Sequence, residues 1–259
     1  MRIDAIIQSC DYADMLAVTL PLNRPSFDNV LVYTKPGDTA TKEVCAANGV
    51  ECIETDGFTA NGSVFNRGYV YNEAFRYTLL GSRGSGRGVP PWLCIIDSDI
   101  VLPHDWRAQF EALPPNYEYF YGVRRYNVET AEQWRAIQAD SDQLRNVTCF
   151  RGYGYGYLQI FSPLSSTFQR LWVETQGNVY PEWIDGSTAD WKLRNAWGDA
   201  PWNPPTQPPD HILDHAAPEP CDPPTGLLRQ LPFNVVHLGI SGMNATGRHT
   251  PLWTIPIQP

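Results

Sequence analysis

Two carboxylates stand where a metal-dependent reaction could use them. Asp97 and Asp99 flank Ser98 directly after Trp92–Ile96, a run of five apolar residues. In an open α/β sheet, ligands bind outside the carboxyl ends of the strands. Two carboxylates there can reach one hard cation, which prefers oxygen ligands and can also hold a diphosphate. Such a cation would stabilise the negative charge that develops on a departing diphosphate. A pair of ordinary strand-end loop residues is the alternative interpretation.

The elements that must position these residues alternate between strand and helix. Gly49 is expected to cap one helix and Pro21 to stop another. The glycines between Gly81 and Gly88 indicate a connector rather than a phosphate loop, because no strand precedes them. This alternation predicts an α/β fold with a mainly parallel sheet flanked by helices. Strands are expected at 3–9, 29–34, 50–54, 92–96, 117–123 and 233–238, and helices at 11–20, 39–48, 66–80, 130–139, 164–174 and 190–197.

Length and composition indicate one globular domain. The chain has 259 residues, of which 42% are hydrophobic and 18% charged, and this balance excludes a disordered protein. We expect a nucleotide-sugar-binding half at 1–126 and an acceptor-binding half at 127–259. The segment 199–224 is rich in proline and is expected to form a long irregular loop.

Charge and cysteine usage narrow the function classes further. The net charge of −9 argues against general nucleic-acid binding. No apolar run reaches the roughly 18 residues of a membrane span, and the N-terminal apolar stretch is too short for a signal peptide. The six cysteines form no CxxC pair, which favours reduced thiols over a disulfide set or a zinc site. A cytoplasmic location is therefore expected, the host cytoplasm if the protein is viral.

Several motifs together resemble the glycosyltransferases of the GT-A fold, family-2-like, over residues 3–248. Asp97-Ser98-Asp99 lies between an aliphatic strand and Ile100–Pro103, as in the Asp-x-Asp motif of that family. The helix that starts at Asn66-Arg67-Gly68 and includes Asn72 is similar to the one that precedes the motif. The resemblance implies that Asp97 and Asp99 hold Mn²⁺ or Mg²⁺, and that Asp97 and Ser98 contact the diphosphate of a nucleotide-sugar. It also implies that Arg67 faces the diphosphate, where its charge is favourable.

Other residues match the donor site of the same family. Gly154 and Gly156, in the glycine- and tyrosine-rich segment 152–157, resemble an acceptor loop whose glycines let backbone approach the donor sugar. A turn leading into a strand is the alternative for that segment. By resemblance, Ser9, Asp11 and Tyr33 occupy the wall that faces base and ribose. Tyr33 would stack on uracil, or else be an ordinary strand-end aromatic.

The candidate catalytic base comes from a degenerate motif. Asp190, Leu193 and Arg194 match the family's helix after its acidic motif, but Ser187 and Thr188 stand where an acidic pair is expected. Asp190 is the first candidate for the base that deprotonates the acceptor hydroxyl, with a helix-capping carboxylate as the alternative. The other candidates are Asp185 and Glu182. An inverting reaction is favoured, and the missing acidic pair leaves a retaining course open.

His237 and Arg248 complete the implied site. His237 resembles the C-terminal histidine that completes the metal site in many GT-A enzymes, and imidazole is a suitable ligand for Mn²⁺. A buried core histidine is the alternative. The tail from Gly239 to Arg248 could fold over the diphosphate, with Arg248 neutralising its charge.

The resulting hypothesis is a metal-dependent glycosyltransferase that moves a sugar from a nucleotide-sugar, a UDP-sugar by preference, to an acceptor hydroxyl. A glycan or small molecule is the default acceptor. A hydroxymethylated base in phage-type DNA is the lesser alternative, with Arg124, Arg125, Arg145 and Arg151 lining a groove. Two other functions stay open. A nucleotidyltransferase would need a glycine-rich loop that Gln8–Asp11 does not provide. A lapsed carbohydrate-binding domain would keep the fold without the chemistry.

Overall fold

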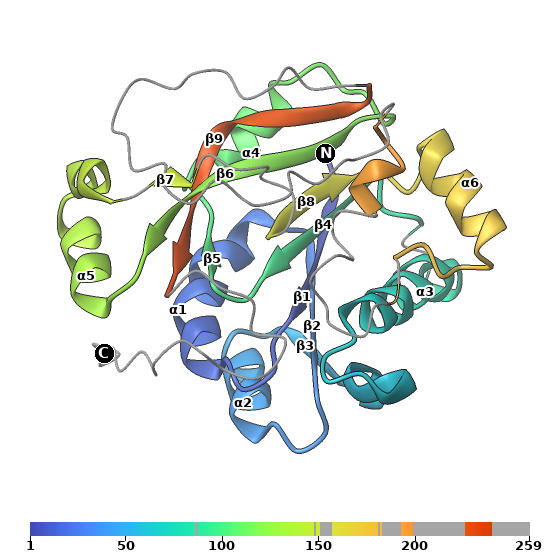
Figure 1. Cartoon of the computed structure of the whole chain (residues 1–259), viewed down its shortest axis with the longest axis horizontal. Helices are drawn as coiled ribbons and strands as arrows, with labels where there is room; N and C mark the ends of the chain where they lie inside the picture. The colour runs from blue at the N-terminus through green and yellow to red at the C-terminus, as the bar shows by residue number, and fades with distance from the viewer. Residues whose placement is uncertain are drawn as a thin grey trace, which may run out of the picture.

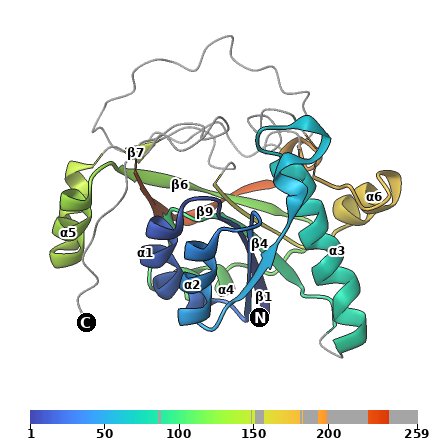
Figure 2. The same ribbon diagram turned by 90° about the horizontal axis from the view of Figure 1, so that it is seen from below.

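One nine-stranded sheet forms the centre of the part of the chain that the structure describes (Figure 1). The structure is a computed structural model, and it describes residues 1–85, 88–147, 149–150, 157–180, 182, 193–198 and 226–239. Helices flank the sheet on both sides (Figure 2), which confirms the expected fold class. The strands are β1 Ile3–Gln8, β2 Asn29–Thr34, β3 Glu51–Glu54, β4 Trp92–Asp97, β5 Ile100–Val101, β6 Phe120–Val128, β7 Cys149–Phe150, β8 Leu158–Phe161 and β9 Leu228–Leu238. The helices are α1 Ala13–Asn23, α2 Thr39–Ala47, α3 Arg67–Ser85, α4 Trp106–Glu111, α5 Ala131–Ala139 and α6 Ser166–Glu174, with short 3-10 turns at Arg24–Ser26, Asp56–Gly62 and Ser141–Asn146.

The order of the strands reverses its winding direction between β1 and β4, which creates a topological switch point. We call this place the reversal of the sheet. The order is β3-β2-β1-β4-β8-β6-β9-β5, with β7 paired to β6. Strands β3, β2, β1 and β4 are parallel, whereas β8 runs antiparallel between β4 and β6. From β1 the chain first builds outward through β2 and β3, and then places β4 on the other side of β1. Ligands of open α/β sheets bind at such a reversal, outside the carboxyl ends of the two central strands.

The central strands are buried on both faces, and their side chains alternate between two cores. All six residues of β1 are buried. Ile3, Ala5 and Ile7 pack in one cluster with Leu16 and other residues of α1, α2 and α4. The side chain of Ile6 points the other way, into a cluster formed with α3 and α6. Because successive side chains of a strand face opposite sides, α1 and α3 cover opposite faces of the reversal.

Helix α1 is longer than expected, so the prediction that Pro21 stops it was wrong. Proline lacks an amide hydrogen and removes one helical hydrogen bond. The turn after it still closes, because the amide of Arg24 donates to the carbonyl of Leu20. The extra turn places Asn23 inside the helix, where it is buried. As expected, Gly49 follows α2 with a positive φ of 61°, a conformation that favours glycine.

Helix α3 and strands β6 and β9 also exceed their expected bounds. Residues 81–85 continue α3 as helix, so the expected connector is shorter. Strand β6 runs on to Val128 because it pairs along its length with β9, from Phe120 opposite Leu228 to Val128 opposite Leu238. This pairing depends on a distant segment. The expected bounds 117–123 and 233–238 rested on local pattern and located only part of each strand.

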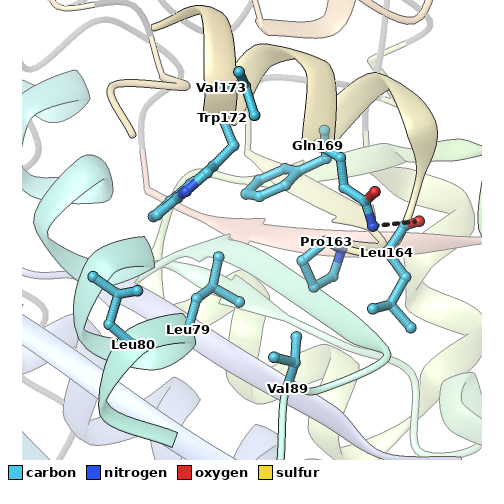
Figure 3. Close-up of a pocket in the computed structure, with 9 residues that line it drawn as sticks. Leu79, Leu80, Val89, Pro163, Leu164, Gln169, Trp172 and Val173 are labelled. Carbon is cyan, nitrogen blue, oxygen red and sulfur yellow. Dashed lines mark hydrogen bonds between the residues drawn. The ribbon is translucent and has the colours of Figure 1, made fainter. Parts of the chain in front are cut away.

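An apolar groove lies at the far end of α3 from Arg67, between this helix and α6 (Figure 3). Its volume is about 310 Å³, and Leu79, Leu80, Phe168 and Trp172 are among its lining residues. None of its nine lining residues is titratable, so it does not provide acid, base or metal-ligand chemistry. In the described ranges no helix combines the length and apolar character that crossing a membrane requires.

Candidate functional site

The polar residues that follow β1 and β4 meet at the reversal of the sheet. Gln8, the last residue of β1, is paired in register with Asp97, the last residue of β4. Ser9 continues beside the end of β2, where its amide donates to the carbonyl of Tyr33 at 2.9 Å. Asp99 lies two residues beyond Asp97 and is buried. The sheet therefore brings Ser9, Asp97 and Asp99 to the edge where an α/β fold binds its ligand.

Side chains of α1 hold the backbone of the turn that carries the two aspartates. The hydroxyl of Thr19 donates to the carbonyl of Ser98 at 2.6 Å. The amide side chain of Asn23 donates to the carbonyl of Ile100 at 2.7 Å and accepts from the amide of Leu102 at 3.0 Å. Thr19 and Asn23 are both buried, so these bonds replace water for groups that would otherwise be unsatisfied. Sequence reasoning missed both residues, and their only signal was polar character inside an apolar helix.

Strand β9 brings His237 to Asp99. His237 is paired with Ile100 across the β5–β9 ladder, and the amide of Leu238 donates to the carbonyl of Asp99 at 2.8 Å. The Nε2 atom of His237 lies 3.4 Å from Oδ2 of Asp99, and the two side chains are only 8% and 12% exposed. His237 therefore lies close to the turn Asp97–Asp99, as expected. We call this segment the acidic turn.

The spacing of Asp99 and His237 is comparable to that of two ligands of one divalent cation. Two ligands of one Mg²⁺-sized ion, each about 2.1 Å from it, lie about 3 Å apart. In the described part of the chain, Oδ1 of Asp99 and Nδ1 of His237 are buried without a hydrogen-bond partner. A carboxylate oxygen with an imidazole nitrogen is a donor set that Mn²⁺ accepts. Within the described ranges, however, no three His, Cys, Asp or Glu side chains converge in a way that could hold a metal ion.

Asp97 is ion-paired with Arg67. Nη2 of Arg67, at the start of α3, donates to Oδ1 of Asp97 at 2.5 Å. The same nitrogen lies 3.3 Å from the hydroxyl of Tyr71, and the guanidinium carbon is 5.7 Å from the centre of the Tyr71 ring. The side chain of Gln8 donates to the carbonyl of Arg67 at 2.9 Å, which fixes the start of the helix beside β1. Arg67 thus faces the acidic turn.

The two aspartates differ in their electrostatics. Burial raises the pKa of Asp97 to about 6, helped by the negative charge of Asp99 and opposed by Arg67. Burial acts on Asp99 in the same direction, but the adjacent His237 outweighs it, and the pKa of Asp99 falls below its usual value. Asp99 is therefore the more readily ionised of the two carboxyl groups and the better anionic ligand.

The residues expected to face base and ribose lie at the ends of β1 and β2. Asp11 has a φ of 58° and pairs with Lys35 at 2.5 Å, next to the ends of β1 and β2. The hydroxyl oxygen of Ser9 is buried without a hydrogen-bond partner among the described residues. Tyr33, in contrast, is only 2% exposed and packs in the core beneath α3. This burial favours the alternative given for Tyr33, an ordinary strand-end aromatic, because strand alternation turns its ring into the protein.

Helix α3 connects the acidic turn to the segment around residue 180. Asn66 caps the helix by accepting the amide of Tyr69 at 2.9 Å. Asn72, fully buried, donates to the carbonyl of Tyr180 at 2.8 Å and accepts from its amide at 2.7 Å. The carboxylate of Glu182 accepts from the side chain of Asn61 at 2.7 Å.

Some of the expected site residues lie outside the described residues. Around the helix expected at 190–197, the described part shows residues 193–195 as helical, with Leu193 and Arg194 buried. Ser98, the remaining expected donor-site residue, is buried, and its carbonyl is bound by Thr19. The expected residues outside the described ranges are Gly154, Gly156, Asp185, Asp190 and Arg248.

Comparisons with known proteins give similarity in structure only. No family model and no curated protein matches this chain. Mannosyl-3-phosphoglycerate synthase from Rubrobacter xylanophilus is 14% identical, with a TM-score of 0.38, over 62% of this chain and 54% of that one. Glucosyl-3-phosphoglycerate synthase from Mycobacterium tuberculosis, in complex with Mn²⁺, UDP and phosphoglyceric acid, is 14% identical, with a TM-score of 0.37, over 62% and 55%.

A third similar structure has a different activity in its name. It is 4-diphosphocytidyl-2C-methyl-D-erythritol synthase, 16% identical with a TM-score of 0.43, over 74% of this chain and 85% of that one. The chain spans between half and two thirds of the length of the two phosphoglycerate synthases. At these identities and TM-scores, the chemistry of this chain has to be judged from its own residues.

Proposed function

We propose that this chain is a glycosyltransferase of GT-A type that takes a sugar from a nucleotide-sugar, a UDP-sugar by preference. The observation that carries the proposal is a set of buried polar atoms at the sheet reversal. Nε2 of His237 faces Asp99 at this edge, and Oγ of Ser9 and Oδ1 of Asp99 lack a hydrogen-bond partner among the described residues. Each such atom costs about 1–3 kcal/mol when left unpaired. A ligand that pairs with them would recover this free energy, and they line the edge where α/β sheets bind nucleotides.

Asp99 and His237 would hold Mn²⁺ or Mg²⁺, with Asp97 beside them. When bound, the cation would act as a Lewis acid on the diphosphate. Arg67 adds positive charge at the same edge, and Arg248 would add more from the C-terminal tail. Ser9 and Asp11 lie on the side expected to face the nucleoside. Gly154 and Gly156 would let backbone approach the donor sugar.

The acceptor hydroxyl needs a base, and Asp190 and Asp185 are the candidates. The carboxylate would accept the hydroxyl proton as the oxygen attacks the anomeric carbon, and the nucleoside diphosphate leaves. This reaction inverts the configuration of the sugar. Because Ser187 and Thr188 replace the expected acidic pair, stereochemical analysis of the product is the direct test between inverting and retaining courses.

A glycan or small hydroxylated molecule is the acceptor we favour. Arg145, one of the arginines expected to line a DNA groove, is ion-paired with Asp142 at 2.6 Å. The net charge of −9 also opposes a polyanionic acceptor. A hydroxymethylated DNA base is therefore the lesser proposal.

The product of turnover separates the candidate functions. The full chain is incubated with a panel of nucleotide-sugars in Mn²⁺, in Mg²⁺ and in EDTA, and released nucleoside diphosphate is measured. Metal-dependent release from one donor, lost in Asp99→Ala, is the expected result. Release of pyrophosphate from a nucleoside triphosphate and sugar phosphate would instead show a nucleotidyltransferase. Donor binding with no turnover against any acceptor in a broad panel would support a lapsed enzyme.

A further inference from the structure

The acidic turn contains two carboxylates with different partners. Asp99 faces His237, whereas Asp97 is bound by the guanidinium of Arg67 at 2.5 Å. The Arg67 side chain is 16% exposed and that of Asp97 is 28% exposed, so the ion pair lies at the rim of the site rather than in the core. An ion pair at a rim can open without exposing apolar core to water.

Arg67 has a second set of contacts that persists if the pair opens. Its backbone carbonyl is fixed by Gln8, and its side chain lies against Tyr71, which is fully buried. The start of α3 would therefore stay in place while the guanidinium moves. A guanidinium binds a carboxylate and a phosphate through the same geometry of N–H donors, so one can replace the other as its partner.

A bound divalent cation would change the charge balance of this turn. Arg67 already neutralises Asp97, so a cation that reached the same carboxylate would meet a positive charge beside it, which is unfavourable at this range. A diphosphate brings the negative charge that a displaced guanidinium needs. On this charge balance, the binding of cation and diphosphate would be coupled through Arg67.

We propose that Arg67 is an exchange residue: it holds Asp97 in the free protein and moves to the phosphate oxygens when a divalent cation and a nucleoside diphosphate bind together. This inference rests on the proposed function. Arg67 acts as a positioning residue for Asp97 before binding and as a phosphate contact afterwards. The exchange would suppress binding of the cation alone and favour its binding with the nucleotide.

The test compares wild type, Arg67→Gln and Arg67→Lys in the full chain, using two binding measurements. Binding of Mn²⁺ alone is followed by electron paramagnetic resonance of the free ion. Binding of UDP in the presence of Mn²⁺ is followed by calorimetry. Arg67→Gln is expected to bind Mn²⁺ alone about tenfold more tightly, since the opposing charge is gone. The same variant is expected to bind UDP with Mn²⁺ about tenfold more weakly, since a charge-assisted hydrogen bond is lost.

The opposite signs of the two effects distinguish exchange from a merely structural role. Arg67→Lys keeps a point charge without the planar fork, so it should restore part of the UDP binding. Arg76→Gln is the control, because Arg76 lies on the same helix and contacts Gly177 and Asn178 instead. If Mn²⁺ binding alone is unchanged or weakened in Arg67→Gln, the exchange is wrong. If wild type binds neither Mn²⁺ nor UDP, the proposed function fails and the exchange fails with it.

Discussion

Oδ2 of Asp99 lies 3.4 Å from Nε2 of His237, although the two residues come from opposite halves of the chain. The contact is built by backbone pairing, because the amide of Leu238 donates to the carbonyl of Asp99. Strand β9 thus positions the imidazole and the carboxylate together. The geometry suits two ligands of one cation, and both side chains have a further buried atom without a partner among the described residues.

Replacement of His237 tests whether this pair binds metal. His237→Gln keeps a polar side chain but removes the imidazole nitrogen from Asp99. We expect Mn²⁺ affinity, measured by calorimetry in the presence of UDP, to fall by about tenfold or more, as losses of metal-site interactions do. His104→Gln, at an exposed histidine, should leave the affinity unchanged. Equal affinity of His237→Gln and wild type would show that the histidine is a core residue only.

We predict that Thr19 and Asn23, two buried residues of α1, stabilise the backbone around the acidic turn. Asn23→Leu keeps the side-chain size but leaves the carbonyl of Ile100 and the amide of Leu102 unpaired. We expect a loss of about 2–6 kcal/mol in the free energy of unfolding, at about 1–3 kcal/mol for each of the two groups. Thr19→Val removes one hydrogen bond to Ser98 and should cost about 1–2 kcal/mol. Urea unfolding followed by tryptophan fluorescence measures both.

Thr59→Val is the matched control for these variants, because Thr59 is exposed. It should stay within about 0.5 kcal/mol of wild type. Thr19→Val should also weaken Mn²⁺-dependent UDP binding, since the turn loses a contact that orients it. A Thr19→Val protein as stable as wild type would show that Thr19 does not support the acidic turn.

We predict that Asp38, which lies beside the ends of β1 and β2, contributes to the stability of the fold in a pH-dependent way. Its carboxylate accepts hydrogen bonds from the hydroxyls of Thr34 and Thr41 and from the amides of Thr41 and Asp11. Burial would raise the pKa of Asp38, but these bonds outweigh it and lower the pKa below its usual value. A lowered carboxyl pKa stabilises the fold above the unfolded-state pKa of about 3.9 and loses this effect as pH falls through the folded-state value.

Asp38→Asn should therefore cost about 1–3 kcal/mol in the free energy of unfolding at pH 7. The difference from wild type should shrink as pH falls below about 4. Urea unfolding at a series of pH values checks this. Asp105→Asn, at an exposed position, controls for the loss of one negative charge. The prediction would be contradicted if the difference in the free energy of unfolding between wild type and Asp38→Asn stayed constant from pH 7 to pH 3.

The acidic turn could be predicted from sequence because its signal is local. An apolar run that ends in Asp97 marks both a buried strand and its carboxyl end, and β4 does end at Asp97. The approach of His237 was expected only from the resemblance to the C-terminal histidine of GT-A enzymes. The pairing of Arg67 with Asp97 could not, since it depends on how α3 packs beside β1 and β4.

Other residues were missed because tertiary contacts override local rules. Pro21 predicts the end of a helix, so the sequence did not indicate that Asn23 is helical. In the structure Asn23 belongs to α1 and binds the carbonyl of Ile100. Tyr33 lies within the strand expected at 29–34. The face of the sheet on which its ring lies is decided by the register of β2 against β1. In each case the deciding partner is distant in sequence, so a pattern along one segment does not contain it.

The most direct test of the central claim is Mn²⁺-dependent binding of UDP to the full chain, measured by calorimetry for wild type and Asp99→Asn. Asp105→Asn is the matched control, an exposed aspartate six residues further along the chain. We predict that wild type and Asp105→Asn bind UDP in Mn²⁺ and lose this binding in EDTA, and that Asp99→Asn binds at least about tenfold more weakly. UDP binding that is absent in wild type, or that Asp99→Asn leaves unchanged, would contradict a metal-dependent nucleotide-sugar site at this turn.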